Sequence, residues 1–285
     1  MARRWLTALA LAALAGCAPS SEPANPAFWQ VSGPHGEKGW LLGTIHALPR
    51  PAAWRSPAIG AALGEANVVA VEIADLDDAA KMAQLFDKLE HSPGLPPLSH
   101  RIDPALRGAL THQLAAAHMT EADFATTETW SAALRLARAG EDSCDSANGI
   151  DRAVLRDAGG KQVFELEGAG VQLGLFDAMP ETLQRAMLNA VLRDAGRGSD
   201  DDLAGAWRKG DFAAIEAETR RGMLAYPALR ETLFTGRNKA WADQLALRLN
   251  RGERVFVAVG AAHMAGPDGL TAMLAARGFR VTRVQ

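Results

Sequence analysis

Apolar residues recur along the chain in two patterns that predict strands and helices in alternation. Short continuous apolar runs bounded by Gly, Pro, Asn or Asp indicate buried strands, whereas apolar residues spaced by three and four indicate helices. The first two strands flank Gly33-Pro-His-Gly36 and are expected to form a hairpin. The predicted strands are 28–31, 39–45, 67–73, 162–166, 254–259 and 280–284.

Helical segments separate the strands. Two of them, 57–65 and 77–89, alternate with the early strands. The others are 104–118, 128–139, 180–193, 201–209, 211–221 and 238–250. This order predicts an α/β fold of mixed α+β character, in which a central mixed sheet is built from N- and C-terminal strands and two helical blocks are inserted. We expect the blocks, about 76–139 and 180–250, to wall a cleft at the carboxyl edge of the sheet.

Two predicted strands end in the same way, at a glycine followed three residues later by a histidine. Trp40-Leu-Leu-Gly43-Thr-Ile-His46 is the first, and Val255-Phe-Val-Ala-Val-Gly260-Ala-Ala-His263 is the second. Glycine allows the backbone to leave a sheet through conformations closed to other residues, so each histidine is expected to project from the carboxyl edge. The pattern indicates two imidazoles in one site; the alternative is two structural histidines bonded to the backbone.

Two acids stand at the ends of apolar strands. Glu72 follows Val68-Val-Ala-Val71, where an ionised side chain is costly unless it is paired, hydrogen-bonded or bound to metal. Glu167 occupies a similar position before Gly168. The alternatives are a buried salt bridge or an acid at the solvated end of a strand.

Two imidazoles and one or two carboxylates suit a divalent metal such as Zn, Mn or Co. The same groups can catalyse without metal, one His acting as a general base oriented by a Glu while the other His or an Arg stabilises negative charge. The sequence leaves both mechanisms open. It has no His-Glu-x-x-His helix, Gly-x-Ser-x-Gly elbow, Walker loop or Cys-x-x-Cys pair, and no nucleotide cofactor is expected.

The N-terminus predicts a secreted, lipid-anchored protein. Arg3-Arg4 precede an apolar stretch too short to span a bilayer, and Leu14-Ala15-Gly16-Cys17 resembles a bacterial lipoprotein cleavage site. We therefore expect a signal peptide at 1–16, a lipidated Cys17 and tether at 17–27, and a single domain at 28–285. An ordinary signal peptide is the alternative. Because residue 18 is Ala, the resemblance to sorted lipoproteins favours the outer membrane, facing the periplasm.

Net charge limits the classes of partner that we expect, and cysteine content limits the disulfides that can form. Removing Arg3 and Arg4 with the signal peptide takes the formal charge from −3 to −5, and no Lys/Arg stripe stands out, so nucleic acid is not expected as a partner. Once Cys17 is lipidated, Cys144 is the remaining cysteine and no internal disulfide can form. We interpret Cys144 as a tolerated loop residue.

Several short motifs, taken together in their order along the chain, resemble the TraB/PrgY/GumN family. They are Trp40–His46, Glu72, Gly149-Ile-Asp151, Gly160-Lys-Gln-Val-Phe-Glu-Leu-Glu167, Arg237-Asn238-Lys-Ala-Trp241 and Val259-Gly260-Ala-Ala-His263-Met-Ala-Gly266-Pro-Asp-Gly269. The resemblance spans about 28–284. It implies a fold related to the Tiki metalloproteases, the erythromycin esterases and the ChaN haem-binding proteins. One departure is Leu-Glu-Gly168, where many relatives have Leu-Glu-Thr.

By position, the resemblance makes His46 and His263 the motif histidines, Glu72 and Glu167 the family's acids, and Arg237 with Asn238 its Arg-Asn pair. Tiki-type relatives are divalent-metal proteases. The leading hypothesis is therefore an envelope hydrolase of peptide or ester bonds, in which His46, Glu72 and His263 hold Mn, Co or Zn. Glu167 would assist proton transfer, and Arg237 with Asn238 would bind a substrate carboxylate or stabilise an oxyanion. The alternatives are a binding protein that sequesters a peptide or tetrapyrrole, and a scaffold with structural histidines.

Overall fold

The computed structural model describes residues 21–138, 144–195 and 200–285. The predicted signal peptide and the lipidation site Cys17 lie outside the described residues. Within the described part of the chain, no helix is long and apolar enough to cross a membrane.

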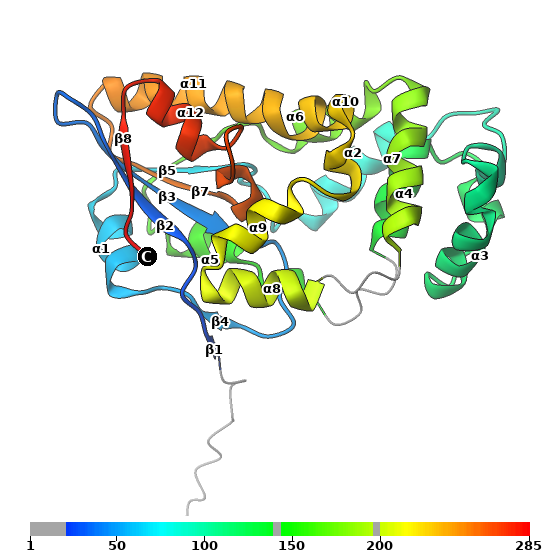
Figure 1. The fold of residues 1–285 in the computed structure, drawn as a ribbon, viewed down its shortest axis with the longest axis horizontal. Coiled ribbons are helices and arrows are strands. Elements are labelled where there is room, and N and C mark those ends of the chain that lie inside the picture. Colours follow the sequence, from blue (N-terminus) through cyan, green and yellow to red (C-terminus); the bar gives the residue numbers. More distant parts are fainter. Residues whose placement is uncertain (1–20, 139–143, 196–199) are drawn as a thin grey trace, which may run out of the picture.

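A six-stranded mixed sheet forms the centre of the fold (Figure 1). Its spatial order is β6-β5-β7-β3-β2-β8. The strands are β2 (Phe28–Ser32), β3 (Lys38–Thr44), β5 (Val68–Val71), β6 (Gln162–Glu165), β7 (Val255–Gly260) and β8 (Arg280–Arg283). All six predicted strands are confirmed, and β2 and β3 form the expected antiparallel hairpin. A separate parallel pair, β1 (Glu22–Pro23) with β4 (Ala52–Ala53), was not predicted.

Helices cover both faces of the sheet (Figure 1). The central strands are buried on both sides, which is why they read as continuous apolar runs. One face packs against α11 (Gly236–Asn250) and α12 (Leu270–Ala276) through Trp241, Leu245 and Leu274. The other packs against α1 (Pro57–Glu65), α5 (Ile150–Asp157) and α8 (Asp200–Lys209) through Ile59, Val154 and Trp207.

The remaining helices form a lobe with its own apolar core beyond the sheet (Figure 1). Fully buried Trp130 and Phe124 lie in this core. The longer helices of the lobe are α2 (Ala79–Leu89), α3 (Arg107–Ala116), α4 (Thr129–Ala137), α6 (Ala169–Asp177) and α7 (Glu181–Asp194). The chain returns through α9 (Phe212–Glu218), η5 (Gly222–Ala225), α10 (Pro227–Arg230) and η6 (Glu231–Thr235). Every predicted helix is found, most with shifted ends, whereas α5, α6, α10 and α12 were not predicted.

Strand register brings the predicted site residues to one edge. β3, β7, β5 and β6 run parallel, with Thr44 opposite Gly260 and Val71 opposite both Ala258 and Glu165. The residues that follow these four strands therefore leave the sheet at the same carboxyl edge, as expected for a site in an open α/β sheet.

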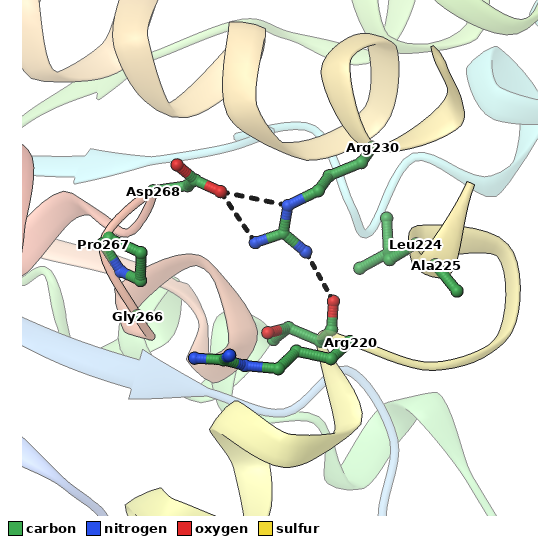
Figure 2. Close-up of a pocket in the computed structure, with 8 residues that line it drawn as sticks. Arg220, Leu224, Ala225, Arg230, Gly266, Pro267 and Asp268 are labelled. Atoms are coloured by element: carbon green, nitrogen blue, oxygen red, sulfur yellow. Dashed lines mark hydrogen bonds and ion pairs between the residues drawn. The ribbon is translucent and has the colours of Figure 1, made fainter. Parts of the chain in front are cut away.

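The loop after β7 is held by hydrogen bonds from an arginine (Figure 2). Arg230 Nε and Nη2 donate to Asp268 Oδ2 at 3.0 and 2.9 Å, and Nη1 donates to the Thr219 carbonyl at 2.6 Å. The guanidinium also lies 4.9 Å from the centre of the Phe234 ring. A cavity of about 320 Å³ lies beside this network. Arg230 thus fixes the loop that follows the second histidine motif.

The start of the described chain contacts the domain. Glu22 pairs with Arg208 at 3.0 Å, and the Asn25 amide donates to the Arg208 carbonyl at 2.7 Å. Contact with the domain thus begins within the segment predicted as a tether.

Candidate active site

The two histidine motifs lie side by side, and each glycine makes room for the other motif. A Cβ on Gly43 would come within 2.9 Å of the Ala261 side chain, whereas a Cβ on Gly260 would lie 3.5 Å from His46 Nε2. Neither glycine has a positive φ, and Gly260 has φ −46°. The predicted reason for these glycines, an unusual backbone conformation, is therefore wrong. Gly43 is needed for close approach to Ala261, whereas a Cβ on Gly260 would make ordinary contacts and would only fill space beside His46.

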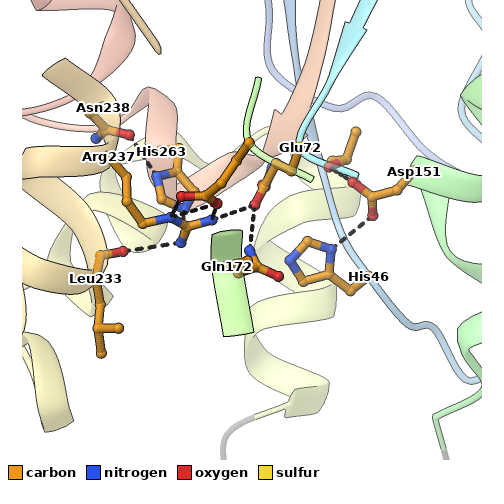
Figure 3. Close-up of polar contacts among 11 residues, drawn as sticks. His46, Glu72, Asp151, Gln172, Leu233, Arg237, Asn238 and His263 are labelled. Carbon is orange, nitrogen blue, oxygen red and sulfur yellow. Dashed lines mark hydrogen bonds and ion pairs between the residues drawn. The ribbon is translucent and has the colours of Figure 1, made fainter. Parts of the chain in front are cut away.

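His46 is held by a buried carboxylate (Figure 3). Its Nδ1 lies 2.9 Å from Asp151 Oδ2, and Thr44 Oγ1 donates to Asp151 Oδ1 at 2.5 Å. The Asp151 side chain is 9% exposed, but that of His46 is 70% exposed. Nδ1 therefore carries a proton directed at Asp151, and Nε2 is accessible to a substrate.

Arg237 lies at the centre of the site and joins its acids (Figure 3). Nε and Nη2 bind Glu167 at 2.7–3.1 Å, and Nη2 also donates to Glu72 Oε2 at 2.9 Å. Nη1 donates to the Leu233 carbonyl at 3.1 Å and lies 3.4 Å from His263 Nε2. All five N–H groups of the guanidinium thus have partners within the protein. η6, which precedes Arg237, is a π-helical turn, a feature found often at functional sites.

Glu72 is buried and accepts hydrogen bonds on both carboxylate oxygens. The Gly260 amide donates to Oε1 at 2.9 Å, and Gln172 Nε2 donates to Oε2 at 3.3 Å in addition to Arg237. A Cβ on Gly260 would lie 3.4 Å from Glu72 Oε1 and 3.5 Å from His46 Nε2. The bare Cα of Gly260 thus leaves a space that both groups face.

His263 is buried and fixed in one tautomer. Its Nδ1 lies 2.6 Å from Asn238 Oδ1, while Asn238 Nδ2 donates to the Asp268 carbonyl at 2.7 Å. Because the Asn238 amide group is committed to that carbonyl, its oxygen accepts the Nδ1 proton of His263. The imidazole lies between Phe234 and Trp241, with ring centres 5.2 and 4.7 Å away.

The two histidines have opposite charge states near neutral pH. The negative charge of Asp151 raises the pKa of His46 from 6.5 to about 9, so His46 is an imidazolium. Burial lowers the pKa of His263 from 6.5 to about 4, so this ring is neutral.

The two buried carboxylates nearest the histidines are ionised. Burial alone would raise the pKa of Glu72, but the positive charges of His46 and Arg237 bring it below 4.5. Burial also opposes the charge of Asp151, yet His46 and Thr44 bring the pKa of Asp151 below 3.8.

The site contains every predicted residue of the domain, in arrangements that were not predicted. The six are His46, Glu72, Glu167, Arg237, Asn238 and His263. Asn238 orients His263, and Arg237 contacts the acids, so neither points freely to solvent. Gly168, the departure from Leu-Glu-Thr, has φ +79° and precedes α6, a conformation that favours glycine.

Asp151 and Gln172 were not among the predicted site residues. Asp151 belongs to Gly149-Ile-Asp151, which carried part of the family resemblance, and this was the available signal. It opens α5, a helix not predicted, and so its approach to His46 could not be anticipated. Gln172 is one polar residue of α6, and no pattern distinguishes it.

Each of the three predicted metal ligands already has a hydrogen-bond partner within the protein: His46 contacts Asp151, Glu72 accepts from Arg237, and His263 contacts Asn238. Glu72 accepts hydrogen bonds on both oxygens, and the Arg237 cation lies between Glu72 and His263 Nε2. Among the described residues, no group of three or more His, Cys, Asp or Glu is placed to hold a metal ion. This donor set does not fit a divalent cation while Arg237 is in place, because like charges repel. Metal binding by these residues stays a prediction.

Comparisons with known proteins identify the family of the chain. Neither the curated proteins nor the solved structures contain a match to the chain. A family model matches residues 27–283, nearly the whole domain, and the chain therefore belongs to the TraB/PrgY/gumN family.

Proposed function

We propose that this protein hydrolyses peptide or ester bonds by acid–base catalysis. The observation that carries the proposal is the pairing of solvent-accessible His46 with buried Asp151, beside the ionised carboxylate of Glu72. An oriented histidine next to a carboxylate, with space between them over Gly260, supplies a proton donor and a proton acceptor for one reaction.

In the proposed reaction, water occupies the space over Gly260 and attacks the substrate carbonyl. Glu72 takes a proton from this water as the new C–O bond forms. The His46 imidazolium gives its Nε2 proton to the leaving oxygen or nitrogen as the scissile bond breaks. Proton transfer from Glu72 to His46, directly or through water, restores both groups.

The other site residues support these two. Arg237 stabilises the ionised form of Glu72 and holds Glu167 in place. Neutral His263, oriented by Asn238, presents an unprotonated Nε2 toward Arg237. In this arrangement Glu167 is a partner of Arg237, and no step of the proposed reaction involves a metal ion.

We propose further that the hydrolase acts in the bacterial envelope, anchored by lipid on Cys17. The support is the sequence alone: a short apolar signal that ends in Leu14-Ala15-Gly16-Cys17. Ala18 favours the outer membrane, facing the periplasm. Two measurements test this anchor. Processing of the wild-type protein should be sensitive to globomycin, and the protein should incorporate radiolabelled palmitate; Cys17→Ala should show neither effect.

The catalytic proposal is tested with ester and peptide substrates and a pair of histidine variants. His46→Ala should lower kcat/KM by about 100-fold or more, the usual contribution of an acid–base group. His112→Ala removes an exposed histidine of α3, in the helical lobe, and should leave the rate unchanged. Equal rates in folded His46→Ala and wild type would refute the role. Ligand binding by a wild type that turns over no substrate would support a binding protein instead.

A further inference from the structure

A second cavity, of about 390 Å³, opens beside the site. Arg237 and His263 form part of its wall, and Arg237 donates to Glu72 Oε2 at 2.9 Å, so the cavity lies next to the acid of the proposed reaction. Its other walls come from α6, α7, α9, η5, η6 and η7 (Ala261–Met264). None of its lining residues belongs to the first inserted block, about 76–139, so this cavity is not the predicted cleft between the two blocks. The proposed reaction uses neither this space nor the apolar residues around it.

The cavity has an apolar interior. Phe234 and Leu233 are 1% and 8% exposed and lie beside the site, and the remaining apolar walls are half-buried. Those walls are Phe176, Met223 and Leu224. Ligand pockets lined mainly by such side chains bind apolar groups through the surface they remove from water.

Charged residues of the cavity are balanced. Glu218 and Arg221 have half or more of their side chains exposed and form an ion pair of 3.5 Å. Two acids, Asp194 and Glu218, are matched by two cations, Arg221 and Arg237, while His263 is neutral. The lining therefore favours neither an anion nor a cation over an uncharged group.

We propose that this cavity is a specificity pocket for one bulky uncharged apolar group of the substrate, adjacent to the scissile carbonyl. A volume of about 390 Å³ lies near the lower end of the range for small-molecule pockets, about 300 to 1,000 Å³. A cavity of about 150 Å³ holds a benzene molecule, so this space accommodates one aromatic or large aliphatic group together with part of the chain that carries it. This inference rests on the proposed function for the scissile bond, but the pocket itself can be tested without turnover.

The test measures binding of two neutral probes, N-acetylphenylalanine amide and N-acetylalanine amide, to the purified full-length protein by calorimetry. Burial of the phenyl ring should lower Kd by about tenfold or more relative to the alanine probe. Met223→Trp fills the cavity and should abolish this preference while leaving affinity for the alanine probe unchanged. Leu247→Trp, which adds the same side chain at an exposed position of α11, should retain the preference.

Met223→Ala provides a second variant that does not crowd the cavity. It should bind N-acetyltryptophan amide more tightly than the wild type does. Equal affinity of the wild type for the phenylalanine and alanine probes would overturn the pocket. So would an unchanged preference in folded Met223→Trp.

Hydrolysis of p-nitrophenyl acetate and p-nitrophenyl 3-phenylpropanoate by the same preparations separates the two proposals. Selective binding with no hydrolysis contradicts the proposed function and supports the pocket. If the wild type hydrolyses both esters and Met223→Trp does not change the ratio of the two rates, the result contradicts the pocket and supports the proposed function.

Discussion

Replacement of Asp151 by Asn should shift the pH range of activity. The substitution keeps the size of the side chain but removes the charge that stabilises the His46 imidazolium. Thr44 Oγ1 donates to one oxygen of this side chain, and His46 Nδ1 faces the other. In Asp151→Asn the amide oxygen would keep the hydrogen bond from Thr44, so the amide NH₂ group would face His46 Nδ1. Two donors cannot share that contact, and the pKa of His46 should fall at least to its ordinary value.

The magnitude follows from the two pKa values of His46, about 9 beside Asp151 and 6.5 without it. At pH 8, about nine tenths of His46 is protonated in the wild type and about 3% in Asp151→Asn. If the imidazolium donates the proton, kcat/KM at this pH should fall about 30-fold. Near pH 5.5, where both proteins hold the proton, the two rates should converge.

The assay is kcat/KM against pH from 5 to 10 for a p-nitrophenyl ester, with buffer blanks for spontaneous hydrolysis. Asp157→Asn is the matched control: it lies on the same helix and removes an exposed ion pair with Arg55. The wild-type rate should decline as pH rises through about 9. A rate that climbs from pH 7 to 9 would refute the reasoning, because His46 would then act as a base.

Four further variants test other parts of the site. Gly260→Ala places a methyl group 3.4–3.5 Å from Glu72 and His46, in the space proposed for the attacking water, and should abolish ester hydrolysis with little loss of thermal stability. Gly43→Ala places its methyl group 2.9 Å from the Ala261 side chain, and this crowding should lower the free energy of unfolding by about 1–3 kcal/mol. The free energy of unfolding of the wild type should decline by on the order of 3 kcal/mol from pH 6.5 to 4, because His263 takes up a proton in the unfolded chain at a higher pH than in the folded protein. Urea unfolding of His263→Gln at both pH values should show a decline that is smaller by this amount. Arg237→Met leaves Glu72 without its cation and should cost about 3–5 kcal/mol at pH 7 and less at pH 4, where Glu72 can take a proton; an equal loss at both pH values would contradict the ion-pair account.

Much of the sheet could be predicted because its central strands are buried on both faces. Val68–Val71 and Val255–Gly260 are continuous apolar runs, and such runs can be recognised in the sequence without knowing which strands lie beside them. The parallel pairing of β3 with β7 agrees with the expectation that the two histidine motifs meet in one site. The family assignment predicted from the same motifs is confirmed.

The contacts within the site could not be predicted, because each depends on a partner distant in sequence. Arg237 lies 165 residues from Glu72 and 70 from Glu167, and nothing local indicates that one guanidinium binds both. Asp151 lies 105 residues from His46. The spacing of the glycines was visible, but their purpose was not, since close approach of two strand ends is a property of the folded sheet.

We propose that this chain's own residues catalyse hydrolysis without a metal ion. Arg237 contacts the acids at the place where the sequence predicts a metal. The most direct measurement combines elemental analysis of the purified protein with ester hydrolysis before and after chelation, in wild type and in His46→Ala/His263→Ala. We expect that chelation leaves the wild-type rate of ester hydrolysis unchanged and that the double variant loses this activity. A stoichiometric metal that is absent from the double variant, with activity restored to chelated wild type only by Mn, Co or Zn, would contradict it.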